Sequence, residues 1–370
     1  MAHAGRRWTR RGFLFTGLAA AGAAAENPRL PAFPSDVQRY ADPSTELDVY
    51  RLTGPAYSSR LPGYYGRAIA RNSGYLLFAC DRTGPPQVFR MDLKTGETRQ
   101  LTEAADLDGG TVTLTPDNRG FCYCAGRSLF LAVFGGKDRE IYRVPEGWEG
   151  ARGMNVGPDG TAATLVETRS GASGGGSRLR LIPLGSGAPR TMVESAVAMT
   201  DPRPRPYRAQ TLYSAGGQGL WLASHDGREN RPLKLAAGRI AAAHWAPDGR
   251  TLLYLVCPED RAQPHVIREH SPDSGADKLV VKTSQFACFS PNRDSSVFAG
   301  ASDSHASPLV LLLLRATGNE KSLCEHGARD AAGVCPVFSP DSQRLYFESD
   351  RDGKPAIYCM HLDRLVEKTA

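Results

Sequence analysis

Short apolar runs and polar turns alternate along most of the chain. A Pro-Asp or Pro-Asn turn followed by an apolar, strand-like run recurs at 114–124, 156–166, 245–255, 289–300 and 338–349. Proline fixes φ at the second position of a turn, and Asp, Asn or Gly accommodates the positions after it. The pattern therefore predicts many short strands joined by tight turns, and no long helices.

The turns recur at a nearly constant interval. Asp117, Asp159, Asp248, Asn292 and Asp341 follow one another at spacings of 42, 89, 44 and 49 residues. The double interval predicts a degenerate copy at 204–215, and a first copy lies at 70–80. Four short strands repeated every 40 to 50 residues or so are typical of a β-propeller blade. The sequence therefore predicts an all-β, seven-bladed propeller, with six blades as the alternative because the fourth copy is weak.

The two ends of the chain fit together as parts of one blade. The last repeat, from Pro336, contains three strand-like runs, and the segment 45–54 resembles the fourth strand of an earlier repeat at 96–103. An N-terminal strand that completes the last blade would close the ring and remove an exposed edge. We therefore expect a single propeller domain at 45–370, preceded by a linker at 26–44.

Residues 1–25 have the pattern of an export signal. Arg10 and Arg11 precede a short apolar run that ends in small residues at 23–25. A charged start, an apolar middle and a small-residue end are typical of a cleaved signal, and the paired arginines indicate the twin-arginine route. The apolar run is too short and too rich in alanine to span a bilayer well. We expect a periplasmic or secreted protein without a stable membrane span.

Composition and charge narrow the classes of partner. The chain is 41% hydrophobic and 23% charged, which is typical of a soluble protein. Removal of the predicted signal takes away four arginines and no acids, so the net charge falls from +6 to +2. No basic field remains for nucleic acid. The eight cysteines form no C-x-x-C pair, and we expect buried free thiols, although an oxidising compartment permits disulfides.

Three segments near the predicted channel carry candidate chemistry. The segment 54–67 places tyrosines beside arginines, and the segment 200–208 places an aspartate beside three more arginines. Arginine can hold a carboxylate with two parallel hydrogen bonds. A third group combines histidine, aspartate and cysteine, which suits a metal ion or a base. The candidates are Arg60, Tyr64, Tyr65, Arg67, Asp201, Arg203, Arg205, His244, Asp330 and Cys335.

Beyond the repeat, several motifs occur in a specific order. These are VYRLTGPAYSSR, YYGRAIARNSGYLLFACDRTG, GETRQLTE, SLCEHG and FESDRDGKPAIYCMHLD. Together they resemble the oligogalacturonate lyase family of seven-bladed propellers, over most of residues 45–363. A single propeller turn is unspecific, but this ordered set is much more specific.

The resemblance implies a reaction and a substrate. Such enzymes cleave short pectin fragments by β-elimination: a basic residue removes the proton beside the uronate carboxylate, and a divalent metal or an arginine neutralises that carboxylate. It therefore implies an acidic oligosaccharide as substrate and a manganese-like divalent metal as candidate cofactor. The implied catalytic residues are Asp201 and Arg205. Of the substrate-binding candidates, Arg67 falls on a matching basic position of the family, whereas Arg60, Tyr64, Tyr65 and Arg203 are predicted to bind substrate from their residue types alone.

The sequence differs from the family at the positions that bind the metal. The family holds its metal with histidines on inner strands and with a Gln-x-x-His-Pro-His-Pro segment that enters the last blade. Here the two histidine positions of that segment hold Gly333 and Cys335, the glutamine position holds Asp330, and the inner-strand histidine falls on Ala242. His244 lies two residues further along, on the same face of the strand. His244, Asp330 and Cys335 are therefore predicted as a substitute set of metal donors.

Two functions follow from the sequence. The first is an exported lyase-like propeller that acts on short oligogalacturonides. The alternative is a non-catalytic propeller, resembling TolB-like domains, that binds an acidic glycan or a protein without a metal.

Overall fold

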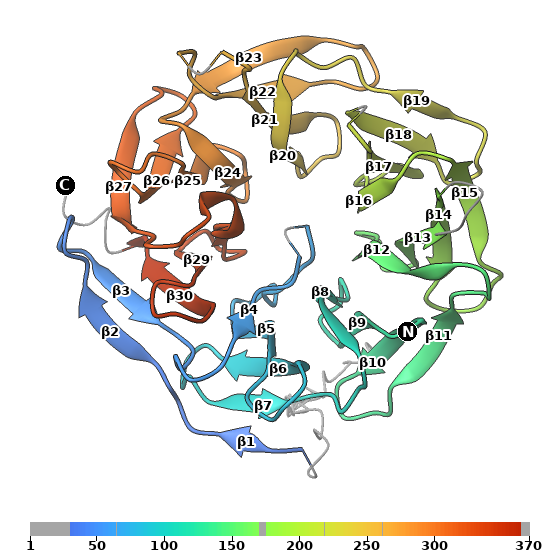
Figure 1. Cartoon of the computed structure of the whole chain (residues 1–370), viewed down its shortest axis with the longest axis horizontal. Coiled ribbons are helices and arrows are strands. Elements are labelled where there is room, and N and C mark those ends of the chain that lie inside the picture. Colours follow the sequence, from blue (N-terminus) through green and yellow to red (C-terminus); the bar gives the residue numbers. More distant parts are fainter. Residues whose placement is uncertain (1–29, 64, 170–174, 218, 261, 364–370) are drawn as a thin grey trace, which may run out of the picture.

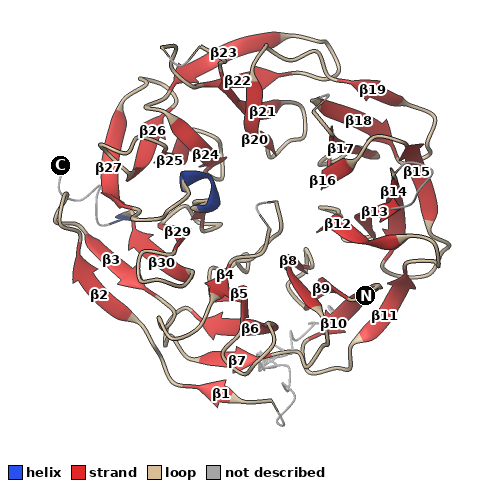
Figure 2. Cartoon of the chain, in the orientation of Figure 1, coloured by secondary structure: helices blue, strands red, loops and turns tan. Residues whose placement is uncertain are grey.

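The chain forms a ring of seven antiparallel sheets around a central axis (Figure 1). The computed structural model describes residues 30–63, 65–169, 175–217, 219–260 and 262–363. Within these residues it contains thirty strands and one short 3-10 helix, η1 (Ala331–Gly333), shown in blue in Figure 2. The all-β, seven-bladed prediction is confirmed.

The blades follow one another in chain order. The first blade contains β4 (Ser59–Arg60), β5 (Tyr75–Cys80), β6 (Gln87–Asp92) and β7 (Thr98–Gln100). The second contains β8 (Leu107–Leu114), β9 (Gly120–Ala125), β10 (Ser128–Val133) and β11 (Arg139–Arg143). The third contains β12 (Glu149–Val156), β13 (Ala162–Arg169), β14 (Gly176–Pro183) and β15 (Arg190–Ser195). The fourth blade contains β16 (Met199–Pro204), β17 (Gln210–Ala215), β18 (Leu220–Ser224) and β19 (Asn230–Pro232). The fifth contains β20 (Arg239–Trp245), β21 (Leu252–Cys257), β22 (Val266–His270) and β23 (Asp277–Lys282). The sixth contains β24 (Phe286–Pro291), β25 (Val297–Ser302), β26 (Leu309–Leu314) and β27 (Glu320–Glu325).

The seventh blade is built from both ends of the described chain. It contains β28 (Val337–Phe338), β29 (Arg344–Ser349) and β30 (Ala356–His361), and β3 (Asp48–Arg51) pairs with β30 as its fourth strand. The predicted closure of the ring by an N-terminal strand is thus confirmed.

A second N-terminal contact reinforces the closure. β2 (Gln38–Ala41) extends the seventh blade beyond β3, and β1 (Ala32–Phe33) pairs with β7 at the outer edge of the first blade. The segment expected as a linker, 26–44, therefore contains two strands, because each finds an open sheet edge to pair with. The export signal predicted for residues 1–25 lies outside the described residues and stays a prediction.

The core lies between the blades. Seven apolar clusters fill the seven junctions between neighbouring sheets. In β21, Leu253 and Leu255 pack toward the sixth blade, whereas Leu252, Tyr254 and Val256 pack toward the fourth. Because side chains alternate between the two faces of a strand, a middle strand buried on both faces must be apolar at every position. Each fully buried side chain of this size contributes about 1.5 to 3 kcal/mol.

The degenerate fourth repeat forms a genuine blade with an altered turn. Its sheet runs from β16 to β19, so the six-blade alternative is wrong. Tyr207 stands directly after the turn proline, with φ of 57° and 84% of its surface exposed. In the neighbouring repeats the left-handed residue comes one position later, at Gly160 and Gly249. This shift of the left-handed position by one residue accompanies the loss of the Pro-Asp-Gly sequence from the turn of the fourth repeat.

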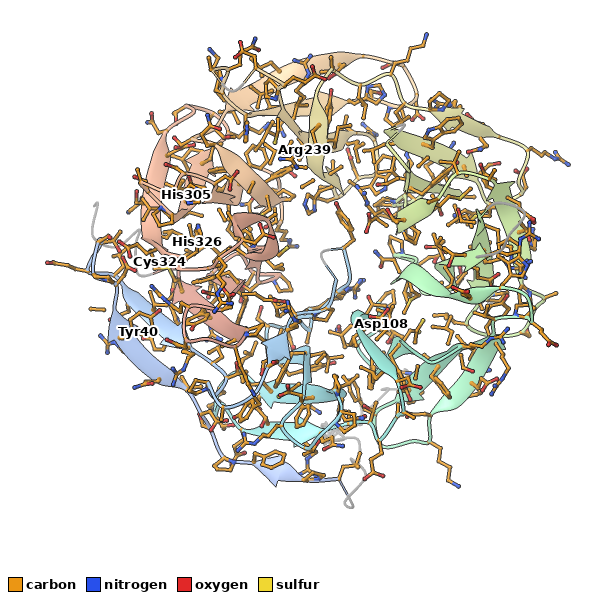
Figure 3. The ribbon with its side chains drawn as sticks, viewed as in Figure 1. Tyr40, Asp108, Arg239, His305, Cys324 and His326 are labelled. Carbon is orange, nitrogen blue, oxygen red and sulfur yellow. The ribbon has the colours of Figure 1, made fainter. Side chains whose placement is uncertain are left out.

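All eight cysteines are free thiols, and seven of them are buried. Figure 3 places Cys324 and His326 in the wall of the ring and not in the channel. His326 Nε2 lies 3.1 Å from the carbonyl of Ser302, and its Nδ1 accepts from Ala328 N–H. In the described part of the chain no helix is long and apolar enough to cross a membrane.

The first blade sends a loop into the channel. Its inner strand pairs with β5 at Ser59 and Arg60 and again through Ala68 and Ala70, but the chain between these contacts leaves the sheet. Figure 1 shows this segment, in blue between β4 and β5, reaching toward the centre of the ring. The excursion brings polar side chains of the first blade toward the inner strands of the others.

Candidate functional site

The channel contains a pocket of about 320 Å³ to which all seven blades contribute. Six inner strands each supply two consecutive residues, and the loop of the first blade supplies Tyr65 and Arg67. The inner-strand residues are Thr113 and Leu114, Asn155 and Val156, Arg203 and Pro204, His244 and Trp245, Ser290 and Pro291, Val337 and Phe338. We call this cavity the channel pocket.

Sequence position explains which residues face the pocket. Thr113, Asn155, Arg203, His244 and Val337 each stand three residues before a turn proline of the repeat. Because the turn ends each inner strand at the same height, equivalent positions in every blade point into the channel. Asn155 and Ser290 were missed by motif reasoning, and this position in the repeat is the signal that finds Asn155.

Arg203 is a buried cation with neutral partners. It is 5% exposed, and its guanidinium donates to the carbonyls of Asp201 and Ala243 at 3.2 and 3.0 Å and to Ser214 Oγ at 3.3 Å. Its Cζ lies 3.9 Å from the centre of the Tyr65 ring. No ion pair between described residues involves Arg203: the neighbouring ion pairs along the chain are those of Arg178 and Arg205. These contacts use three of the five N–H groups of an arginine.

Arg67 is a second guanidinium in the same pocket. Its Nη1 donates to the carbonyl of Thr115 at 3.3 Å, and its backbone N–H donates to Thr113 Oγ1. Burial, with a smaller contribution from the nearby charge of Arg71, lowers the pKa of Arg67. Among the described residues it has no carboxylate partner either. The pocket therefore holds two positive charges that no described acid balances with an ion pair.

His244 and Tyr65 form an aromatic wall beside Arg203. Their ring centres are 5.5 Å apart, and Asn155 Nδ2 donates to the carbonyl of Tyr65 at 2.8 Å. His244 Nε2 lies 2.8 Å from the carbonyl of Phe289, so Nε2 carries a proton and Nδ1 is the acceptor nitrogen in the neutral ring. Burial, and then the charge of Arg203, lowers the pKa of His244 to about 3. The imidazole is thus neutral at physiological pH.

The catalytic candidate Asp201 and the substrate-binding candidates Arg60 and Tyr64 lie apart from the pocket lining or outside the described residues. Asp201 is exposed, has φ of 53°, and accepts from Thr200 Oγ1 at 2.8 Å. It does not line the channel pocket. The Arg60 side chain is 64% exposed and lies 3.5 Å from Glu348. Tyr64 lies outside the described residues.

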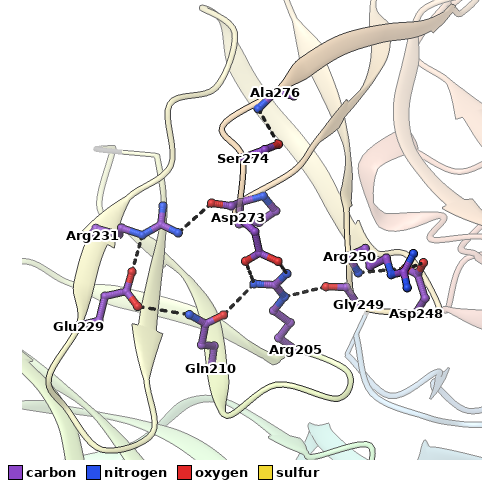
Figure 4. A network of polar contacts seen from close by, with 11 residues as sticks. Arg205, Gln210, Glu229, Arg231, Asp248, Gly249, Arg250, Asp273, Ser274 and Ala276 are labelled. Atoms are coloured by element: carbon purple, nitrogen blue, oxygen red, sulfur yellow. Dashed lines mark hydrogen bonds and ion pairs between the residues drawn. The ribbon is translucent and has the colours of Figure 1, made fainter.

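Arg205 is held in a structural ion pair and not in the pocket. Its guanidinium binds both carboxylate oxygens of Asp273, at 2.8 and 2.7 Å, and also Gln210 Oε1 and the carbonyl of Gly249 (Figure 4). Its side chain is 1% exposed. Gly249 and Asp273 belong to the fifth blade, so Arg205 ties the fourth blade to the fifth. Every nitrogen of its guanidinium is already used, which argues against the catalytic role implied by the resemblance.

The predicted metal donors do not come together. In the described part of the chain, no three His, Cys, Asp or Glu side chains are placed to share a metal ion. Asp330 accepts from Ala332 N–H as the N-cap of η1. Cys335 Sγ lies 3.2 Å from the carbonyl of Ala332, and burial raises the pKa of its thiol. The donor set predicted from His244, Asp330 and Cys335 is therefore wrong: η1 uses two of the groups locally, and His244 binds Phe289.

Glu348 holds the base of the channel loop and was missed from sequence. Its Oε1 accepts from Leu61 N–H at 2.6 Å, directly before the loop that carries Tyr65 and Arg67. Its side chain is 12% exposed. Burial raises its pKa to about 7, against smaller lowering by Leu61 and Arg60. An apolar strand gives no signal for such a group, because its burial depends on the loop folded over it.

This carboxyl predicts a pH-dependent stability. Its pKa in the folded protein exceeds the ordinary value of 4.5 for a glutamate, so folding favours the protonated form and wild-type stability falls as pH rises from about 4.5 to about 7. Glu348→Gln removes this titration and keeps an acceptor for Leu61. We expect the variant to gain on the order of 3 kcal/mol over the wild type between pH 4.5 and 8, measured by urea unfolding. The exposed Glu103→Gln is the control, and parallel curves for wild type and Glu348→Gln would contradict the assignment.

Known proteins resemble the chain over nearly its whole length. The oligogalacturonide lyase of Pectobacterium atrosepticum is 23% identical over 372 residues, which cover 88% of this chain and 96% of that protein. The oligogalacturonate lyase of Dickeya dadantii is 23% identical over 86% of this chain and 94% of its own length.

Solved structures share the fold. An oligogalacturonate lyase in complex with manganese superimposes with a TM-score of 0.84 at 23% identity, over 91% of this chain and 99% of that one. The oligogalacturonate lyase of Vibrio parahaemolyticus gives a TM-score of 0.83 at 21% identity, over 91% and 98% of the two chains. Residues 32–170 match the sequence model of the oligogalacturonate lyase family, and the likeness to this family predicted from the ordered motifs is therefore confirmed.

Proposed function

We propose that the protein binds short oligogalacturonides in the channel pocket and cleaves them by β-elimination. The observation that carries this proposal is the pair of guanidiniums, Arg67 and Arg203, which line one pocket without an ion pair to any described carboxylate. A buried charge without a partner of opposite sign is costly. A uronate carboxylate supplies that partner, and the names of the similar lyases point to such a substrate.

The pocket also suits the sugar around the carboxylate. Tyr65 and Trp245 give it aromatic surface, and Asn155 and Ser290 give it hydrogen-bonding groups. Binding sites for small ligands commonly combine an apolar lining with a few placed polar groups. Positive charge fixed beside the carboxylate would stabilise the negative charge that this group gains when the neighbouring carbon loses its proton.

His244 is the proposed proton acceptor, in place of Asp201. It lines the pocket beside Arg203, and Nδ1 is the acceptor nitrogen of its neutral ring. Nδ1 takes the proton from the ring carbon next to the carboxylate, and a carbon–carbon double bond forms as the glycosidic carbon–oxygen bond breaks. The departing oxygen takes a proton from water, and the hydroxide left behind takes up the proton that His244 accepted, which restores the neutral imidazole. A carboxylate bound at Arg203 offsets the charge that helps to lower the pKa of His244, so the substrate would strengthen its own base.

The direct test is the ultraviolet absorbance of the unsaturated product during incubation with di- and trigalacturonate. We expect the absorbance to rise, and an active lyase of the family serves as positive control. A flat trace together with measurable binding of trigalacturonate would support the second candidate below. A flat trace without binding would overturn the proposal.

The second candidate is a propeller that binds acidic oligosaccharides without cleaving them. It is favoured by the chemistry of His244, whose low pKa makes it a weak base, and by the absence of any Asp or Glu side chain from the pocket lining within the described chain. Binding of an acidic oligosaccharide requires the two guanidiniums but no proton acceptor.

A further inference from the structure

We infer that Arg203 supplies the fixed positive charge for the substrate carboxylate and that this chain binds its sugar without a divalent metal. The inference rests on the proposed function, because it concerns the same pocket and the same class of ligand. In binding its sugar without a metal, this chain would differ from the similar lyase whose structure was solved in complex with manganese.

The donor groups near the pocket do not fit a metal ion. Metal sites of this class need at least three nitrogen, oxygen or thiolate ligands that converge on one point. No such group of His, Cys, Asp and Glu exists in the described ranges. His244 directs Nε2 at the carbonyl of Phe289, and the side chain of Ala242, two residues before it, carries no donor atom. At the entry to the last blade, Val334 is fully buried in the apolar cluster between the sixth and seventh blades.

Arg203 occupies the same wall as His244. Its Nη1 donates to the carbonyl of Ala243, the residue directly before His244, and both side chains line the channel pocket. His244 Nε2 is held by a backbone carbonyl, and the Arg203 charge further disfavours a second cation beside the ring. A guanidinium and a divalent ion would therefore compete for this place.

The guanidinium is fixed before any ligand arrives. Three hydrogen bonds to neutral acceptors and the face of Tyr65 hold it, so little side-chain freedom remains to be lost on binding. Two of its N–H groups stay available for a carboxylate. Because those acceptors carry no net charge, they leave the positive charge of Arg203 uncompensated.

The first experiment titrates manganese into chelator-treated, dialysed protein by calorimetry, in the absence of sugar. We expect no stoichiometric binding. One equivalent of manganese bound with micromolar affinity would overturn the inference, whatever the sugar does.

The second experiment titrates trigalacturonate into the same metal-free protein. We expect binding that manganese does not strengthen and that the methyl-esterified trisaccharide, which lacks the charges, does not show. Binding that appears only after manganese is added would overturn the inference and leave the proposed function standing. Absence of binding with and without manganese would overturn both.

Variants locate the charge. Arg203→Gln should weaken trigalacturonate binding about 10- to 100-fold, as expected for the loss of a charge-assisted hydrogen bond to a carboxylate. Arg203→Lys, which keeps the charge, should recover part of that loss, and thermal unfolding of both variants reports whether the fold survives. Equal affinity for wild type and a folded Arg203→Gln would contradict the role of Arg203. The exposed Arg208→Gln, from the turn after β16, is the matched control.

Discussion

Arg205→Ala is expected to lower the stability of the propeller by about 2 to 4 kcal/mol and its melting temperature by about 5 to 10 °C. The side chain is 1% exposed and binds Asp273 with two parallel hydrogen bonds, so its removal leaves Asp273, Gln210 and the carbonyl of Gly249 without their partner. We place the estimate below that for a fully buried pair because the Asp273 side chain is 56% exposed to water. Thermal unfolding followed by circular dichroism measures the effect.

The same variant separates a structural role from a catalytic one. At 25 °C the folded Arg205→Ala protein should keep its affinity for trigalacturonate, since Arg205 does not line the channel pocket. Arg208→Ala is the control, because Arg208 is exposed and lies three residues further along the chain. An unchanged melting temperature together with lost binding or turnover would restore the catalytic role that the sequence resemblance implied.

The repeat could be predicted from sequence because it depends on local chemistry. Pro-Asp turns and two-residue alternation recur in each blade, and the closure by β3 follows from an unpaired strand at each end. β1 and β2 could not be predicted in this way. Their two and four residues pair only because the outer edges of the first and seventh blades are open to them.

The site was predicted less well, because it depends on contacts between blades. Arg67, Arg203, Tyr65 and His244 were singled out and all line the channel pocket. Arg205 was singled out for its matching position, but only the fold reveals that Asp273, 68 residues away, holds its guanidinium.

The predicted metal donors are also separated by contacts that residue type and position in the sequence do not reveal. His244, Asp330 and Cys335 are the right types of residue, yet η1 uses Asp330 as its cap and takes Cys335 into the same turn. Neither fact can be read from residue type. Glu348 shows the converse, since an unremarkable glutamate in a strand becomes a buried group under the channel loop.

His244→Gln is expected to lower turnover of trigalacturonate about 100- to 10,000-fold, the usual contribution of a positioned general base. Glutamine can still donate to the carbonyl of Phe289 but has no nitrogen that accepts a proton at neutral pH. Affinity should change little, because the charges of Arg67 and Arg203 remain. The control is Asp201→Asn, which removes the base that the sequence resemblance implied and should keep turnover within about threefold of the wild type, since Asp201 lies outside the pocket lining.

The pH profile gives an independent test of the same base. An ordinary histidine would lose activity as pH falls through about 6.5. Because the pKa of His244 is about 3, the imidazole stays unprotonated in the free enzyme, and kcat/KM, which reports the free enzyme, should stay level between about pH 5 and 7. An acid limb near pH 6.5 that persists in His244→Gln would assign proton transfer to another group. A level profile together with turnover lost in His244→Gln and kept in Asp201→Asn would place the base beside Arg203. There one bound carboxylate both pairs with its cation and raises the basicity of the imidazole that removes the proton from the neighbouring carbon.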